Sequence, residues 1–168
     1  MEKRCFVGIG FDDDDVSSLL AHSDLELEDD RYPSHITLIN PEETQWVLNR
    51  YGREVLRRTM ASRTWDGISE TRIKPTGFRT LGQLGEKDGN SHLVCLVEWR
   101  NNGLTAACRE SLGLGSGGSR LPEHITVCKK WHRGAEGLVT PIGLTLGITG
   151  VFLYSKEPGG SRQHEQLV

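Results

Sequence analysis

The stretch RYPSHITLIN, residues 31–40, is echoed 89 positions later by RLPEHITVCK, residues 120–129. Both contain Arg, one further residue, Pro, one further residue, and then His-Ile-Thr followed by an aliphatic residue. Each His-Ile-Thr segment is rich in β-branched residues, which favours a strand. The repetition predicts two equivalent strands, one in each half of the chain.

Each predicted strand presents an imidazole and a hydroxyl on one face. Side chains two positions apart on a strand point the same way, so His35 projects with Thr37, and His124 projects with Thr126. The intervening aliphatic residues then face the opposite layer. If the two strands lie close at the centre of the fold, one cleft contains all four polar groups.

Two imidazoles and two hydroxyls in one cleft are suited to phosphoryl chemistry. A histidine with an ordinary pKa of about 6.5 can hold either protonation state at neutral pH. A neutral imidazole can take a proton from an attacking hydroxyl, and an opposite imidazolium can protonate the leaving oxygen. Each of these proton transfers typically raises the reaction rate by about 10²- to 10⁴-fold. Threonine hydroxyls can donate hydrogen bonds to the non-bridging phosphate oxygens. The reaction needs neither a metal nor a covalent nucleophile.

The remaining patterns predict an α+β chain built from two related lobes, each with one His-x-Thr strand and one long helix. Residues 1–157 are expected to form a single domain with an internal pseudo-twofold, and residues 158–168 a flexible tail. Apolar and β-branched runs predict strands, and amphipathic spacing with Pro and Asn starts predicts helices. The strands are expected within 3–11, 35–39, 65–82, 91–99, 124–131 and 142–156, and the helices within 16–27, 41–61 and 101–114.

Composition excludes several classes of protein. The chain has 168 residues, a net charge of −3 and a 36% hydrophobic share, as one soluble domain would. Stable binding to long duplex DNA is not expected at this charge balance. The apolar runs are too short to span a bilayer and no signal peptide is recognisable, so we expect a cytoplasmic monomer.

No cofactor or metal is expected. The four cysteines share no C-x-x-C spacing and lie in apolar segments, which favours buried free thiols. The run Asp12–Asp15 is interpreted as a solvated loop or helix start, because adjacent carboxylates diverge and repel. The glycine-rich stretch 113–118 lacks the context of a nucleotide-binding loop and is interpreted as a mobile connection.

Three further residues are candidates for contact with a substrate. Tyr154 lies on the last predicted strand and could reach the cleft, although a tyrosine within the core fits equally well. Lys129 and Trp131 follow the second motif and could steer a phosphate or stack on a base, with a plain basic loop as the alternative.

The two motifs, their separation, the strand–helix order around each and the closing strand ITGVFLYSK (148–156) resemble the two-histidine phosphoesterase superfamily. The resemblance covers about residues 3–156. That family includes cyclic phosphodiesterases, RNA 2′-5′ ligases, and phage or viral enzymes that destroy cyclic or 2′-5′-linked oligonucleotide signals. It implies a bilobal fold with a central cleft between two antiparallel sheets, helices outside, and no metal. It also implies a catalytic tetrad of His35, Thr37, His124 and Thr126.

Three functions are compatible with this sequence. The first is a metal-independent phosphodiesterase that opens 2′,3′-cyclic phosphates or cleaves short oligonucleotides, with a nucleotide or short oligonucleotide as its partner. The second is a phage-type nuclease that degrades cyclic di- or trinucleotide immune signals. The third is a non-catalytic module that binds RNA ends or nucleotides. His124 is expected to activate water and His35 to protonate the leaving oxygen, and the near-twofold geometry leaves the reverse assignment open.

Overall fold

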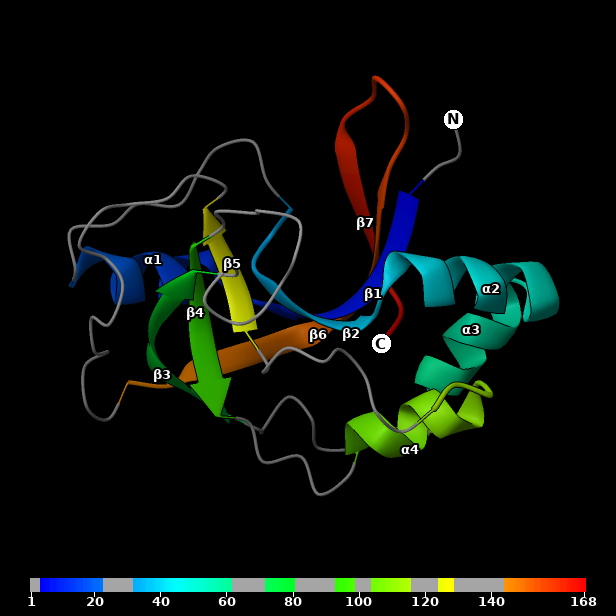
Figure 1. The fold of residues 1–168 in the computed structure, drawn as a ribbon, viewed down its shortest axis with the longest axis horizontal. Coiled ribbons are helices and arrows are strands. Elements are labelled where there is room, and N and C mark those ends of the chain that lie inside the picture. Colours follow the sequence, from blue (N-terminus) through cyan, green and yellow to red (C-terminus); the bar gives the residue numbers. More distant parts are fainter. Residues whose placement is uncertain are drawn as a thin grey trace.

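The computed structural model describes residues 4–22, 32–61, 72–80, 93–98, 104–115, 124–128 and 144–168. Figure 1 shows the elements coloured along the chain. The strands are β1 (Arg4–Phe11), β2 (His35–Ile39), β3 (Arg72–Thr80), β4 (Leu93–Glu98), β5 (His124–Cys128), β6 (Leu146–Lys156) and β7 (Arg162–Gln166). The helices are α1 (Asp13–Ala21), α2 (Pro41–Tyr51), α3 (Arg53–Met60) and α4 (Leu104–Ser111). The α+β class predicted from the sequence is confirmed.

The helix starts follow local capping rules. Asp12 caps α1 by accepting a hydrogen bond from the amide of Asp14, so the acidic run is indeed a helix start. Asn40 and Glu43 form a reciprocal capping box at the start of α2. The single helix expected over 41–61 is divided at Gly52, whose φ of 82° is not helical. No helix in the described ranges is long and apolar enough to cross a membrane.

The strands pair antiparallel in two groups. One group contains β2, β1, β6 and β7, and the other contains β3, β4 and β5. Only two registered pairs, Arg72 with Gly147 and Ile73 with Leu146, join β3 to β6 and so connect the groups. The two antiparallel groups are thus joined through the long strand β6 into one seven-stranded sheet.

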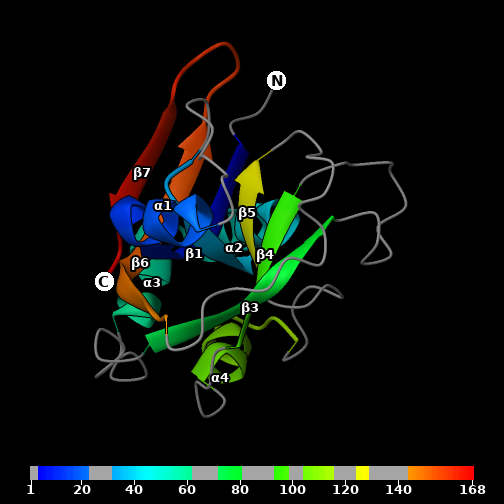
Figure 2. The same ribbon diagram turned by 90° about the vertical axis from the view of Figure 1, so that its left-hand side faces the viewer.

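The strands β2 and β5 lie at opposite ends of the strand order and nevertheless contact each other. Figures 1 and 2 show β5 beside β2, in front of the sheet that β1 and β6 form. The chain therefore curls so that its two His-Ile-Thr strands meet. This contact is the feature of the fold that positions the candidate site.

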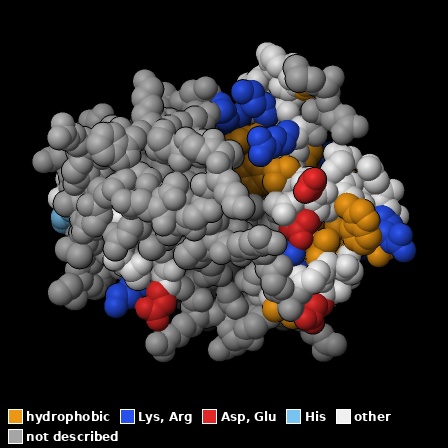
Figure 3. Space-filling model, viewed as in Figure 1, with side chains coloured by type: hydrophobic (Ala, Val, Ile, Leu, Met, Phe, Trp, Pro, Cys, Tyr) orange, Lys and Arg blue, Asp and Glu red, His pale blue; other side chains and the backbone are white. Residues whose placement is uncertain are grey.

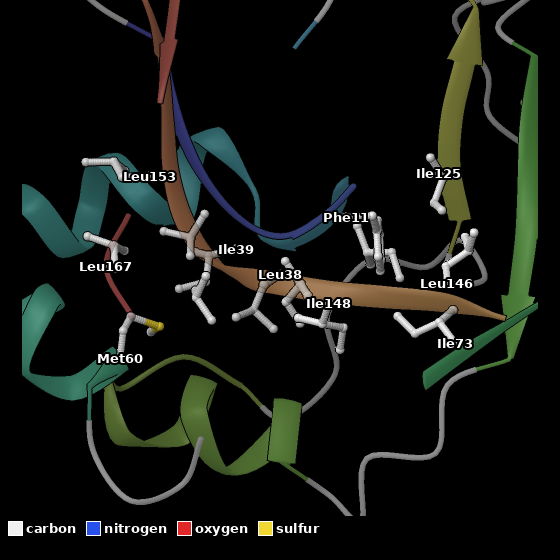
Figure 4. Close-up of a cluster of buried hydrophobic side chains, with 14 of the residues drawn as sticks. Phe11, Leu38, Ile39, Met60, Ile73, Ile125, Leu146, Ile148, Leu153 and Leu167 are labelled. Atoms are coloured by element: carbon white, nitrogen blue, oxygen red, sulfur yellow. The ribbon is translucent and has the colours of Figure 1, made fainter. Parts of the chain in front are cut away.

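The hydrophobic core extends from one group of strands to the other. In Figure 4, Ile125 of β5 lies at the same end of the hydrophobic cluster as Phe11, and Leu38 and Ile39 of β2 lie further along β6. These side chains are buried together with residues from the helices and from the C-terminal segment. Burial of the aliphatic residues of both motifs fixes which face of each strand carries the polar side chains.

The expectation of a flexible tail over 158–168 is wrong for its last seven residues. The strand β7 pairs with β6, Leu167 is 5% exposed, and the amide of Leu167 donates to the carbonyl of Val151 at 2.7 Å. Arg53 of α3 also forms an ion pair with Glu165. The segment is polar in sequence because most of its strand lies at the sheet edge. One buried leucine is too weak a sequence pattern to predict that strand.

The prediction of buried free thiols is confirmed for the cysteines that the structure describes at side-chain level. Cys5, Cys95 and Cys108 are buried thiols that form no disulfide among the described residues. Burial raises the pKa of Cys95 to about 12. Cys95 is therefore a core residue and not a reactive thiol.

Candidate active site

The first motif has the alternation that the sequence predicts. On β2, His35 is half-buried and Thr37 is exposed, whereas Ile36 and Leu38 are buried. The polar pair thus occupies the accessible face and the aliphatic pair the core.

The second motif repeats this pattern on β5. His124 and Thr126 are half-buried, and Ile125 between them is fully buried. Both strands expose a His-x-Thr pair, and the strands contact each other. The contact of the two strands is shown, and the shared cleft with all four polar groups stays a prediction.

The imidazole of His35 is oriented by its own chain. Nδ1 lies 2.7 Å from the carbonyl oxygen of Pro33. A carbonyl can only accept, so Nδ1 carries the hydrogen and Nε2 is the acceptor nitrogen of the neutral ring. Any proton that His35 exchanges with a substrate therefore passes through Nε2.

Aromatic rings pack around His35. Its centroid lies 4.9 Å from that of Phe6 and 4.8 Å from that of Tyr154, and these two rings stack on each other at 5.0 Å. The ring of Tyr32 stands edge-on to His35 at 6.2 Å. Contacts of this kind restrict the imidazole to one orientation.

Tyr154 lies beside His35, but its side chain is enclosed. It is 1% exposed, and burial raises its pKa far above the ordinary value of 10.0, with the negative charge of Asp13 adding to the effect. Its phenol stays neutral throughout the physiological range. These contacts fit a residue that supports the His35 ring better than one that contacts a substrate.

Gly8 of β1 provides the room for this packing. A β-carbon there would lie 3.0 Å from the carbonyl oxygen of Ile36, 3.0 Å from Cε2 of Tyr154 and 3.5 Å from Cβ of His35. Any larger side chain would force one of these groups to move. The sequence offered only a faint sign of this role, in the Gly-x-Gly of the first strand.

The residue before His35 is held by the first helix. The buried Ser34 donates from its amide and its hydroxyl to Oδ1 of Asp13, at 3.0 and 2.8 Å. The amide of Phe11 in turn donates to the carbonyl of Ser34 at 3.0 Å. The start of α1 thus fixes the point at which β2 begins, a role that the sequence did not reveal.

Arg109 of α4 is a second residue that sequence reasoning missed. It is 2% exposed, forms a two-pronged ion pair with Glu43, and donates to the backbone carbonyls of Leu38 at 3.1 Å and Gly115 at 2.9 Å. Arg109 therefore joins α4, α2 and the far end of β2. No motif marks it, because its partners come from separate parts of the chain.

The other sequence candidates fall outside the described residues. Lys129 and Trp131 both do, so their expected contact with a substrate stays a prediction. Most of the glycine-rich stretch also lies outside, and its described start at Gly113–Gly115 packs beside α2 and α4. Within the described ranges, no group of three or more His, Cys, Asp or Glu side chains could hold a metal ion.

Comparison with known proteins identifies solved structures with a similar fold. No family model and no curated protein sequence matches the chain. The solved structure of E. coli LigT complexed with phosphate is similar, with a TM-score of 0.50 and 14% identity over 99% of this chain and 94% of that one. LigT complexed with 3′-AMP gives a TM-score of 0.48 and 15% identity over 99% and 95%. The chain therefore shares the fold of E. coli LigT.

Proposed function

We propose that this protein is a metal-independent phosphodiesterase that acts on nucleotide phosphodiesters, with His35, Thr37, His124 and Thr126 as its catalytic groups. One observation carries the proposal: the two His-x-Thr strands, from opposite ends of the strand order, contact each other. Two such pairs on meeting strands can surround one phosphate. The phosphate bound to E. coli LigT, which has the same fold, supports a phosphoryl substrate.

The geometry of His35 supports a role in proton transfer through Nε2. In the opening of a 2′,3′-cyclic phosphate, His124 takes a proton from water, whose oxygen forms a bond to phosphorus. The bond between phosphorus and one ribose oxygen breaks, and that oxygen receives a proton from Nε2 of His35. The hydrogen bond from Nδ1 to Pro33 persists in both protonation states and keeps Nε2 aimed throughout the transfer.

The threonines have a different part. Thr37 and Thr126 donate hydrogen bonds to the non-bridging oxygens, which are anionic before and during the reaction. Each such bond to a charged oxygen is worth about 1.5–3 kcal/mol, divided between binding and chemistry. Loss of either hydroxyl should therefore weaken turnover less than loss of either imidazole.

The test is a turnover screen in the presence of EDTA. It covers 2′,3′-cyclic mononucleotides, linear 2′-5′ and 3′-5′ oligonucleotides, and cyclic di- and trinucleotides, and product analysis then separates simple hydrolysis from attack by a substrate 2′-hydroxyl. We expect turnover of at least one substrate, nearly abolished by His35→Ala or His124→Ala and reduced to a smaller extent by Thr37→Ala or Thr126→Ala. His22→Ala, at the exposed end of α1, is the control.

Two outcomes would overturn the proposal. Activity that EDTA removes and a divalent ion restores would contradict metal-independent catalysis. Nucleotide binding with no turnover of any substrate in the screen would instead identify a binding module that keeps the two-histidine arrangement.

A further inference from the structure

Three basic residues lie in one row across the sheet. The register places Arg4 of β1 opposite Lys156 of β6, and Lys156 opposite Arg162 of β7. Directly paired residues project their side chains to the same face. Three cationic side chains therefore stand next to one another on adjacent strands, at the end of the sheet where β1 begins.

This row shares its face with the candidate active site. Two positions along the same strands, Phe6, Tyr154 and His164 form the next row, and Gly8 begins the one after it, opposite Thr37. The aromatic row thus separates the basic row from the first His-x-Thr pair. Since a strand rises about 3.3 Å per residue, the basic row lies about 13 Å from Gly8.

Tyr32 connects the two sites at closer range. The guanidinium carbon of Arg162 lies 5.2 Å from the centroid of the Tyr32 ring, which lies 6.2 Å from that of His35. Burial raises the pKa of Tyr32, and the positive charges of Arg162 and Arg4 oppose this effect. The Tyr32 ring therefore places Arg162 within reach of a substrate that is bound at His35.

A row of like charges is costly to the sheet. Cationic side chains directly opposite each other destabilise strand pairing. Arg4 and Lys156 take part in none of the salt bridges found among the described residues. The neighbouring carboxylate of Glu165 belongs to the opposite face, where it pairs with Arg53. Figure 3 shows Lys and Arg side chains gathered beside hydrophobic ones in the upper part of the face seen in Figure 1.

We propose that Arg4, Lys156 and Arg162 form a second anion subsite, which binds a phosphate of the substrate other than the one between the histidines. The inference rests on the proposed function and narrows its substrate class to oligonucleotides with at least two phosphates, linear or cyclic. A 2′,3′-cyclic mononucleotide has a single phosphate, which the two His-x-Thr pairs occupy. Such a substrate leaves nothing for the basic row to bind.

The kinetic test compares substrates with one phosphate and with several. The variant Arg4→Gln/Lys156→Gln/Arg162→Gln should lose about 10- to 100-fold in kcat/KM on an oligonucleotide, mostly through KM, because hydrogen bonds to a charged phosphate oxygen are worth that much. Its kcat/KM on a 2′,3′-cyclic mononucleotide should be unchanged. Arg58→Gln on α3 is the matched control, since Arg58 is exposed and pairs with Glu54 of its own helix. Arg4→Lys/Arg162→Lys should restore most of the loss, because the charge is kept.

A binding measurement does not depend on turnover. Fluorescence anisotropy with a labelled 2′-O-methyl trinucleotide should show weaker binding by the triple Gln variant. The slope of log K against log salt should also fall in magnitude by about 0.7 for each phosphate that the variant no longer binds. Parallel measurements with linear and cyclic oligonucleotides identify which of the two the subsite prefers.

The outcomes separate this inference from the proposed function. Equal losses on the mononucleotide and the oligonucleotide, or no loss on either, would overturn the second subsite while leaving the phosphodiesterase intact. Absence of turnover on every substrate would overturn the proposed function. In that case an unchanged affinity and salt slope of the triple Gln variant would overturn the subsite as well, and a reduced affinity would support it. Circular dichroism checks that the variant is folded.

Discussion

The imidazole of His35 is held from several sides by groups that belong to different segments. The carbonyl of Pro33 accepts from Nδ1, Phe6 and Tyr154 pack near its ring, and the hydrogen bonds from Ser34 to Asp13 fix the backbone next to it. In the proposed mechanism, none of these neighbours exchanges a proton with the substrate. They matter because a proton donor must be placed within a fraction of an ångström of its target.

Gly8→Ala tests this packing at the residue scale. The new methyl group would meet the carbonyl of Ile36 and the ring of Tyr154 at 3.0 Å, so the strand or the ring must shift. We expect a loss of about 1–3 kcal/mol in unfolding free energy. We also expect a fall in kcat that exceeds the rise in KM, because the position of His35 is disturbed.

The matched control for that substitution is Gly115→Ala. A β-carbon at Gly115 meets nothing within 4 Å. Equal effects of the two substitutions on kcat, measured with the same substrate, would show that His35 does not depend on the space at Gly8.

At the scale of elements, Arg109 connects two helices with the strand β2. Its guanidinium joins Glu43 at the start of α2 to the carbonyl of Leu38 in β2 and to Gly115 beyond α4. The buried charge is tolerated because its donors are shared among several acceptors. The hydrogen bonds and the positive charge of Arg109 lower the pKa of Glu43 below its ordinary value of 4.5, against a smaller opposing effect of burial.

The ion pair of Arg109 with Glu43 predicts a pH-dependent contribution to the free energy of unfolding. Since the pKa of Glu43 is lowered by folding, its contribution is complete above the ordinary carboxyl range and disappears as the pH falls through the lowered value. Glu43→Gln should therefore reduce the unfolding free energy at pH 7 and have little effect near pH 2. Urea unfolding at several pH values measures this difference. A difference that stays constant with pH would contradict the role of the ion pair.

Arg109→Ala should cost more than Glu43→Gln. It removes a donor from two backbone carbonyls and leaves the Glu43 carboxylate with the hydrogen bond from the amide of Asn40. Breaking a buried pair costs about 3–5 kcal/mol. The same urea experiment at pH 7 measures both variants. A smaller effect of Arg109→Ala than of Glu43→Gln would show that Arg109 is not the centre of this junction.

Removal of β7 is a second test at the element scale. Ending the chain at Ser161 deletes the pairing with β6, the buried Leu167 and the ion pair of Glu165 with Arg53. Burial of one leucine alone is worth about 1.5–3 kcal/mol. We expect a clearly lower Tm by calorimetry, whereas Leu167→Ala in the full chain should give part of the loss. An unchanged Tm for the truncated chain would support the flexible tail that the sequence suggested.

At the scale of the whole molecule, the two motifs depend on each other. The catalytic proposal requires one neutral and one charged imidazole, which come from β2 in one group of strands and from β5 in the other. The two groups of strands are linked by the pairing of β3 with β6, and they meet again where β2 contacts β5. A disturbance that separates the groups should therefore remove activity without unfolding either.

This dependence predicts the pH–rate profile. Because the two imidazoles must be in opposite protonation states, kcat/KM should follow a bell with its maximum between about pH 6 and 8. The double variant His35→Ala/His124→Ala should be little worse than either single variant, since the pair acts as one relay. Rates measured from pH 4 to 10 test the profile. A monotonic rise to pH 10 would indicate hydroxide or another base.

The sequence by itself determined the periodic features. Alternation in each His-Ile-Thr segment sets which side chains face the core, and the Asn40, Pro41 and Glu43 signals set where α2 begins, because both depend on residues close in the chain. The α+β class and the equivalence of the two motifs follow from such local patterns.

Only the tertiary structure decided which distant groups meet. Several contacts join segments that are far apart in the chain. They are the contact of β2 with β5, the space at Gly8 under Tyr154, the links from Asp13 to Ser34 and from Arg109 to Leu38, and the pairing of β7. No local pattern encodes them, because each is the outcome of burying the apolar faces of all elements at once. The row of Arg4, Lys156 and Arg162 exists only because strand register aligns three separate positions.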